Sequence, residues 1–176
     1  MRTLYKYETD GGPGFDQYLG LVQAWSSDVA TDVDELIDRV AFNYLVGNAD
    51  AHAKNYSLLQ TNRGIRLAPA YDLVSTHAYP RLTTNMATAI SGLFDPGALQ
   101  PEHWRKWFKA LDLSTQRYEQ RVGDLAERAV AAAPGVRKWV GEQALDHPVV
   151  GRIVKLLTER AKRLRAVKEA HSTVKA

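Results

Sequence analysis

The sequence predicts a mainly α-helical domain that carries one small β-hairpin. Apolar residues recur every three or four positions from Val33 to Leu45, and again through most of the chain after Pro101. This spacing places apolar side chains along one face of a helix. Residues 56–67 instead show two short strand patterns around a turn. With 176 residues, the chain has the length of a single domain and can hold a hydrophobic core.

The first helices follow a glycine-rich loop. Residues 8–14 contain three glycines and a proline, which leave little room for regular structure. Residues 15–25 are expected to form a short helix. Thr31 is expected to cap the next helix, because Asp34 follows three residues later as an acidic form of the capping box. Gly47 is placed to end that helix by adopting a left-handed conformation.

A hairpin is expected after a polar loop. Residues 56–60 and 65–67 are the expected strands, and the turn at residues 61–64 joins them. Residues 69–73, with the sequence PAYDL, follow at once. The predicted order is therefore helix, polar loop, hairpin and acidic residue.

The second half of the chain is predicted to be helical. Pro101 suits the first position of a helix, and aromatic residues follow it at helical spacing. Ser114 is expected to cap a further helix that stops near Pro134. Residues 136–145 and 148–168 are expected to form the last two helices.

The composition is that of an ordinary globular protein, with 45% hydrophobic and 24% charged residues. The absence of cysteine excludes disulfides, thiolate metal ligands and a cysteine nucleophile. No stretch reaches the roughly 18 apolar residues of a membrane-spanning helix, and no signal-peptide pattern opens the chain. We therefore expect a cytoplasmic protein without a membrane partner.

The net charge of +3 is unevenly spread, because residues 151–176 carry eight Lys or Arg against two acidic residues. One alternative function is therefore a basic helix that binds nucleic acid or an acidic partner. The other interpretation is a solvated helix face whose cations favour the negative end of the helix dipole. No known DNA-binding motif accompanies the charge, so nucleic acid is not the expected primary partner.

The segment that most indicates chemistry runs from Asn48 to Asn55. Its sequence, NADAHAKN, alternates hydrogen-bonding or ionisable side chains with alanines. Asp50, His52 and Lys54 are the ionisable members. Large polar side chains separated by small ones in a loop suggest groups directed at a shared space.

The spacing of the polar residues suits phosphoryl transfer. That reaction needs a carboxylate to orient the attacking hydroxyl and oxygen ligands to hold Mg²⁺ against the phosphates. Asp50 and Asn55 are five residues apart, like the base Asp and the metal-binding Asn of protein kinases. Asp72 follows the predicted hairpin, where a second metal-binding Asp is expected. Taken singly, the two Asp residues also fit turns, His52 a packed histidine and Lys54 a surface charge.

Three segments of the chain resemble the HipA family of bacterial kinase toxins. They are KYETDGGPG near the start, AFNYLVGNADAHAKNYSLL across the polar loop, and RLAPAYDLVST after the hairpin. The family pattern is N/T-x-D-x-H-x-K-N followed by P-x-Y-D, and both parts occur here in order. The resemblance is strong from Lys6 to Thr76 and weaker through the C-terminal helices. It implies the fold of a protein-kinase-like C-terminal lobe.

The resemblance also implies a Ser/Thr kinase that uses ATP and Mg²⁺. Asp50 would be the catalytic base, while Asn55 and Asp72 would bind the metal ion and the nucleotide. His52 and Lys54 would lie near the phosphates or near the catalytic carboxylate. Family members phosphorylate proteins, best known among them aminoacyl-tRNA synthetases, and a DNA-binding antitoxin encoded beside them neutralises them.

The sequence departs from the family in one respect. Members carry an N-terminal lobe of strands with a lysine that pairs with ATP, whereas the 49 residues before Asp50 predict loop and helix. We therefore expect residues 1–176 to form a C-terminal lobe without the ATP-binding N-terminal lobe. Three alternatives stay open: a fragment of a larger kinase, a lobe that assembles with a separate N-terminal polypeptide, or an inactive lobe that binds an antitoxin or another partner.

Overall fold

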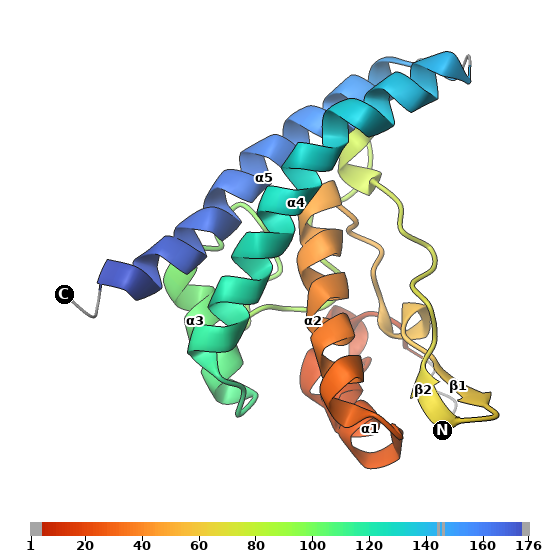
Figure 1. Cartoon of the computed structure of the whole chain (residues 1–176), viewed down its shortest axis with the longest axis vertical. Helices are drawn as coiled ribbons and strands as arrows, with labels where there is room; N and C mark the ends of the chain where they lie inside the picture. Colours follow the sequence, from red (N-terminus) through yellow and green to blue (C-terminus); the bar gives the residue numbers. More distant parts are fainter. Residues whose placement is uncertain (1–4, 144, 146, 174–176) are drawn as a thin grey trace.

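The computed structural model describes residues 5–143, 145 and 147–173, and this part of the chain is helical with one two-stranded hairpin at its edge (Figure 1). The predicted fold class is confirmed. No helix in the described part is both long and apolar enough to span a bilayer. In chain order the elements are η1 (Glu8–Asp10), α1 (Phe15–Trp25), α2 (Val29–Val46), η2 (Ala53–Asn55), β1 (Leu58–Thr61), β2 (Gly64–Leu67), η3 (Thr76–Ala78), α3 (Pro101–Ala110), α4 (Thr115–Glu142) and α5 (Pro148–Thr173).

Helix α2 stands at the centre of the fold. It packs against α1 and β2, and also against the long pair formed by α4 and α5 (Figure 1). Its residues Ile37 and Leu45 are completely buried, and Trp104 and Phe108 of α3 join them in the same core. The predicted aromatic stripe of α3 therefore packs into the core. Because α2 is so firmly enclosed, the polar loop that follows it starts from a fixed point.

Three predicted helix limits in the first half are confirmed and one is wrong. Helix α1 has the predicted bounds, and Gly47 ends α2 in the left-handed region with a φ of 75°. Helix α2 begins at Val29, before the predicted cap at Thr31. Asp28 takes the cap position, and its carboxylate accepts a hydrogen bond from the Thr31 amide at 3.3 Å.

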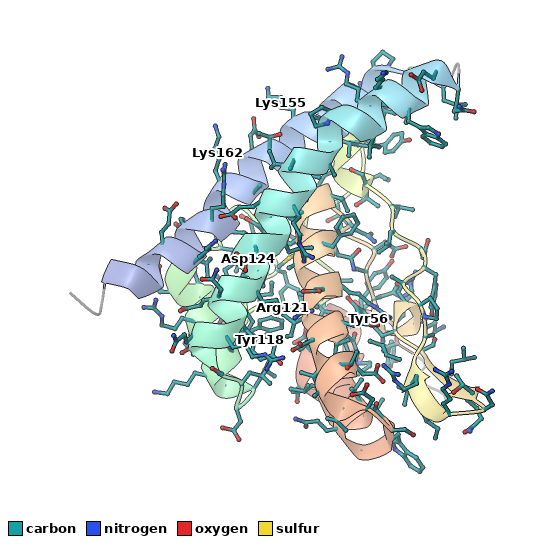
Figure 2. All side chains as sticks on the ribbon, viewed as in Figure 1. Tyr56, Tyr118, Arg121, Asp124, Lys155 and Lys162 are labelled. Atoms are coloured by element: carbon teal, nitrogen blue, oxygen red, sulfur yellow. The ribbon has the colours of Figure 1, made fainter. Side chains whose placement is uncertain are left out.

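The hairpin lies where it was expected, with a small shift. Thr61 pairs with Gly64 across the turn, and β1 begins two residues later than predicted. The backbone of Tyr56 is extended and its ring stacks on Tyr18, with ring centroids 5.0 Å apart, but strand pairing begins only at Leu58. Figure 2 shows Tyr56 beside α2.

Helix α4 corrects the predicted second half. Ser114 caps it as expected, but the helix passes through Pro134 and ends at Glu142. The separate helix predicted at residues 136–145 is therefore the end of α4, with Ala144 outside the described residues. Proline inside a helix costs about 3 kcal/mol. Helices α4 and α5 lie side by side (Figure 1), and Ala133, next to the proline, is buried.

The last helix exposes less basic charge than its sequence suggests. Arg160 is buried, and Lys168 pairs with two carboxylates of α4 at 2.7 and 3.1 Å. Figure 2 shows Lys155 and Lys162 pointing away from the fold. Lys175 lies outside the described residues. The basic residues of α5 therefore divide between structural contacts and a solvated face.

The carboxylate of Asp32 anchors the hairpin to α2. Arg66 donates hydrogen bonds to both of its oxygens at 2.8 to 3.2 Å, and the amide of Leu67 and the hydroxyl of Ser26 donate at 2.8 and 2.6 Å. Burial raises the pKa of Asp32, but these donors outweigh it and hold the pKa below its usual value. Asp32 thus joins α2 to β2, and Ser27 adds two hydrogen bonds to the backbone of Ile65 at 2.8 and 3.0 Å.

Replacing Asp32 with alanine is expected to lower the free energy of unfolding by about 3 kcal/mol, because the Arg66 guanidinium and the Leu67 amide lose their acceptor. Urea unfolding should show a lower midpoint with an unchanged slope. Glu142→Ala, which removes a carboxylate that is 57% exposed, is the control. Its expected effect is below about 0.5 kcal/mol. Equal losses in the two variants would contradict the anchoring role.

Candidate active site

The polar loop is organised by the buried amide of Asn48. Its Nδ2 donates to Asn43 Oδ1 at 2.9 Å and to the backbone carbonyl of Asp72 at 3.1 Å. Its Oδ1 accepts a hydrogen bond from the backbone amide of Asp50 at 3.0 Å. One side chain thus joins the segment of Asp50 to the segment of Asp72. These segments are 22 residues apart in the sequence.

Asn55 and Asp72 lie in direct contact. Asn55 Nδ2 donates to Asp72 Oδ2 at 2.7 Å, and Asn55 Oδ1 accepts from the backbone amide of His52 at 2.9 Å. Asp72 has a φ of 56°, a left-handed conformation that non-glycine residues seldom adopt. Hydrogen bonds to its carbonyl and to its side chain hold Asp72 in this conformation. Strain of this kind is concentrated at functional sites in proteins.

Three side chains surround one oxygen of Asp50. The hydroxyl of Tyr7 donates to Asp50 Oδ1 at 2.5 Å. Lys6 Nζ lies 3.5 Å from the same oxygen, and His52 Nε2 lies 3.8 Å from it. Tyr7 and Lys6 come from the start of the chain, so the segment just before the glycine-rich loop and the polar loop together build the surroundings of this carboxylate.

His52 is buried beside Asp50. Its side chain packs edge-on against the ring of Tyr7, and its Nδ1 has no hydrogen-bond partner in the described part of the chain. Burial lowers the pKa of His52, and the charge of Lys6 lowers it further, against a smaller opposing effect of Asp50. The imidazole is therefore neutral at neutral pH and can donate or accept a hydrogen bond.

Lys54 is the predicted site residue that the fold does not bring to the carboxylates. Its side chain is exposed, and within the described residues no ion pair joins its ammonium to Asp50 or Asp72. The cation beside Asp50 is Lys6. Contact with the Tyr7 hydroxyl, and then the charge of Asp50, raise the pKa of Lys6 above its usual value.

The glycine-rich loop contributes more than the sequence indicated. The carboxylate of Glu8 accepts a hydrogen bond from the Ala89 amide at 2.7 Å. The Glu8 amide also donates to the Ala87 carbonyl at 3.1 Å. Tyr7 and Lys6 were not predicted as site residues, and no local pattern distinguishes them. Their only signal was their place in the family-like segment KYETDGGPG.

Comparison with known proteins places the chain in a family. The family model described as HipA-like C-terminal domain matches residues 1–133. The chain belongs to this family. The HipA-like domain is 33% identical over 160 residues to a protein of Sinorhizobium fredii named Putative kinase Y4mE. That alignment covers 91% of the domain's chain and 38% of the relative.

Two matches come from Shewanella oneidensis. The serine/threonine-protein kinase toxin HipA is 39% identical over 88 residues, which is 50% of this chain and 20% of the toxin. A solved complex of HipA, HipB and operator DNA superposes with a TM-score of 0.77 at 26% identity, over 93% of this chain and 42% of that chain. The HipA-like domain therefore spans less than half the length of these relatives.

The chemistry of Asn55 and Asp72 fits Mg²⁺. Magnesium prefers oxygen ligands and is usually held by one or two protein groups together with phosphates and water. The Asp72 carboxylate has one oxygen engaged by Asn55, and the Asn55 carbonyl oxygen has a second lone pair. No group of three or more His, Cys, Asp or Glu in the described residues offers a denser metal site. The pair suits a metal shared with phosphates.

Hydrogen bonds from Arg160 to His77 and from His77 to Thr84 hold the segment that follows Asp72. Arg160 donates to His77 Nδ1 at 2.8 Å, and His77 Nε2 lies 2.7 Å from the Thr84 carbonyl. Because a guanidinium can only donate, Nδ1 must be unprotonated and Nε2 must carry the hydrogen. Burial, and then the charge of Arg160, lower the pKa of His77. These two hydrogen bonds therefore require His77 to be neutral.

The stability of the domain is expected to fall as the pH drops below about 6.5, the pKa of an unperturbed histidine. In that range the unfolded chain takes up a proton that the folded state resists, so stability is complete above the unfolded pKa. His52 contributes in the same direction. Urea midpoints measured from pH 7.5 to 5.5 should decline less steeply in His77→Asn, which keeps an acceptor for Arg160. Parallel profiles for the two proteins would contradict the assignment.

Proposed function

We propose that the HipA-like domain transfers the γ-phosphoryl group of ATP to a Ser or Thr hydroxyl of a protein. The observation that carries this proposal is the double hydrogen bond of Asn48 to the segments of Asp50 and Asp72. It brings a carboxylate suited to a hydroxyl group next to a pair suited to a metal ion. Positioning and electrostatic stabilisation account for almost all catalysis of phosphoryl transfer.

Each site residue has a proposed task. Asp50 orients the acceptor hydroxyl and takes its proton, while the hydroxyl oxygen bonds to the γ-phosphorus and the bond to the β-phosphate oxygen breaks to leave ADP. Asn55 and Asp72 hold Mg²⁺, which would offset the charge of the phosphates. Neutral His52 supports Asp50 from the buried side. The exposed ammonium of Lys54 is available to a phosphate oxygen.

The partners are proposed from the relatives. An aminoacyl-tRNA synthetase is a proposed substrate, and a DNA-binding antitoxin is a proposed partner. The match to a complex of HipA, HipB and operator DNA supports the second of these. The matched relatives are more than twice as long as the aligned region. A further lobe, in the same or in a separate polypeptide, is therefore proposed to complete the nucleotide site.

The same structural match favours a second candidate function. Because 93% of the chain superposes on a protein that assembles with HipB and DNA, the domain is also a candidate binding module for an antitoxin without catalysis. The two candidates differ in the role of Asp72. A kinase needs its carboxylate to hold Mg²⁺ and the nucleotide, whereas a binding module without catalysis does not.

Calorimetric titration of the 176-residue chain with Mg-ATP separates these candidates. We expect binding in the unaltered chain and a loss of affinity of at least about ten-fold in Asp72→Ala, because even outer partners of a metal contribute this much. Glu142→Ala is the carboxylate control and should bind like the unaltered chain. Absence of Mg-ATP binding even when the further lobe is present would favour the binding-module candidate.

Asp50→Asn is expected to keep Mg-ATP affinity and to lower phosphoryl transfer by about 10²- to 10⁴-fold, because the amide cannot accept the hydroxyl proton. Transfer of labelled phosphate from ATP to purified aminoacyl-tRNA synthetases measures this. Equal rates in Asp50→Asn and the unaltered chain would exclude Asp50 as the base. Phosphorylation of other proteins alone would instead replace the proposed substrate class.

A further inference from the structure

Lys6 is a cation of the polar site that has no assigned task. Phosphoryl transfer spreads negative charge over the three oxygens of the transferring group, and a protein cation commonly offsets it. His52 is neutral, because burial and then the charge of Lys6 lower its pKa. Lys54 is exposed, and in the described part of the chain no ion pair joins it to either carboxylate of the site. Of the residues around the carboxylates, Lys6 therefore fits this need best.

Contacts of the backbone and of the side chain fix the position of Lys6. Its carbonyl accepts a hydrogen bond from the Ala53 amide at 3.3 Å, which joins the start of the described chain to η2. Its Nζ lies 3.5 Å from Asp50 Oδ1 and 4.6 Å from the centroid of the Tyr7 ring. Among the described residues it is the only Lys or Arg that forms an ion pair with Asp50. The fold thus holds this ammonium beside the proposed base.

The ammonium of Lys6 keeps hydrogen-bond donors for a ligand. Its separation of 3.5 Å from Asp50 Oδ1 is longer than the roughly 2.7 to 3.2 Å of an ordinary N–H···O hydrogen bond, so the contact is mainly an attraction of charges. A lysine ammonium has three N–H donors, and the Lys6 side chain is 37% exposed. Contact with Tyr7 raises the pKa of Lys6, so the group is charged at neutral pH. It can therefore hold oxygens of a phosphoryl group.

Proton transfer to Asp50 changes the charge that Lys6 presents to a ligand. Before the reaction the ionised carboxylate offsets part of the positive charge of Lys6, because the two groups are close. The carboxylate becomes neutral when it takes the hydroxyl proton, while the hydroxyl oxygen bonds to the γ-phosphorus and the bond to the β-phosphate oxygen breaks. Lys6 therefore attracts the phosphoryl oxygens more strongly in the transition state than in bound ATP. Interactions with this difference raise kcat.

We propose that Lys6 is a catalytic residue that holds the transferring phosphoryl group, and that Lys54 contributes only to binding of the nucleotide. The ion pair of Lys6 with Asp50 supports the first role, since it places the ammonium where the proton and the phosphoryl group move. The exposed side chain of Lys54 supports the second role. This inference rests on the proposed function and assigns the two lysines different tasks in it.

Calorimetric titration with Mg-ADP, with and without aluminium fluoride, tests the role of Lys6 apart from turnover. Aluminium fluoride takes the place of the transferring phosphoryl group. We expect Lys6→Met to bind Mg-ADP like the unaltered chain and to lose about 100-fold in affinity for the fluoride complex, the typical loss when one donor to developing charge is removed. Lys54→Met, the same change in the neighbouring lysine, should weaken both complexes by the same factor. Unchanged affinity of Lys6→Met for the fluoride complex would overturn the assignment.

Steady-state rates of phosphoryl transfer separate a catalytic role from a structural one. Lys6→Met should lower kcat by about 10²- to 10³-fold and leave the KM for ATP nearly unchanged, whereas Lys54→Met should mainly raise this KM. Lys6→Arg keeps the positive charge and should recover at least ten-fold of the lost kcat. Urea unfolding midpoints of the three variants should match that of the unaltered chain. Equal kcat values for Lys6→Arg and Lys6→Met would contradict a role of the charge.

The same titrations distinguish failure of this inference from failure of the proposed function. If the unaltered chain binds the fluoride complex tightly and the two Met variants lose affinity for it equally, the assignment of Lys6 is wrong and the proposed function stands. If neither complex binds, even when the further lobe is present, the proposed function fails and the role of Lys6 fails with it.

Discussion

The arrangement of the site depends on how the C-terminal end of α2 is held. Gly47 allows α5 and η3 to approach so closely that a Cβ at this position would lie 2.4 Å from Leu156 Cδ2 and 2.8 Å from His77 Cβ. Its carbonyl also accepts hydrogen bonds from the Thr76 hydroxyl and the His77 amide. The start of the polar loop and the segment after Asp72 therefore meet at one point. Asn48, the residue after Gly47, then contacts the Asp72 carbonyl and the Asp50 amide.

The polar groups around this junction are organised before any ligand arrives. The buried amide of Asn48 uses both its donor and its acceptor on neighbouring segments, and Asp72 is held in a left-handed conformation by two of its own partners. Groups that are fixed in advance need no reorganisation during a reaction, which is the main source of electrostatic catalysis. Asp50 is held in the same way, since the hydroxyl of Tyr7 donates to its Oδ1 at 2.5 Å.

Local signals predicted the local features well. The apolar spacing of α1 and the glycine at position 47 determine structure through contacts within a few residues, and both predictions were confirmed. Predictions went wrong where distant contacts competed with local preference. Pro134 does not end α4, which continues beside α5 to Glu142. The ring of Tyr56 stacks on Tyr18, 38 residues away, and the pairing of β1 begins only at Leu58.

The sequence by itself determined the family, the fold class and the polar residues of the loop, because residue type and spacing are directly visible in it. The tertiary structure alone decided which of them share a site. It brought Asn55 to Asp72, left Lys54 exposed, and placed Tyr7 and Lys6 against Asp50 from more than 40 residues away. Such contacts depend on how complete helices and loops pack, and no periodicity along the chain encodes that arrangement.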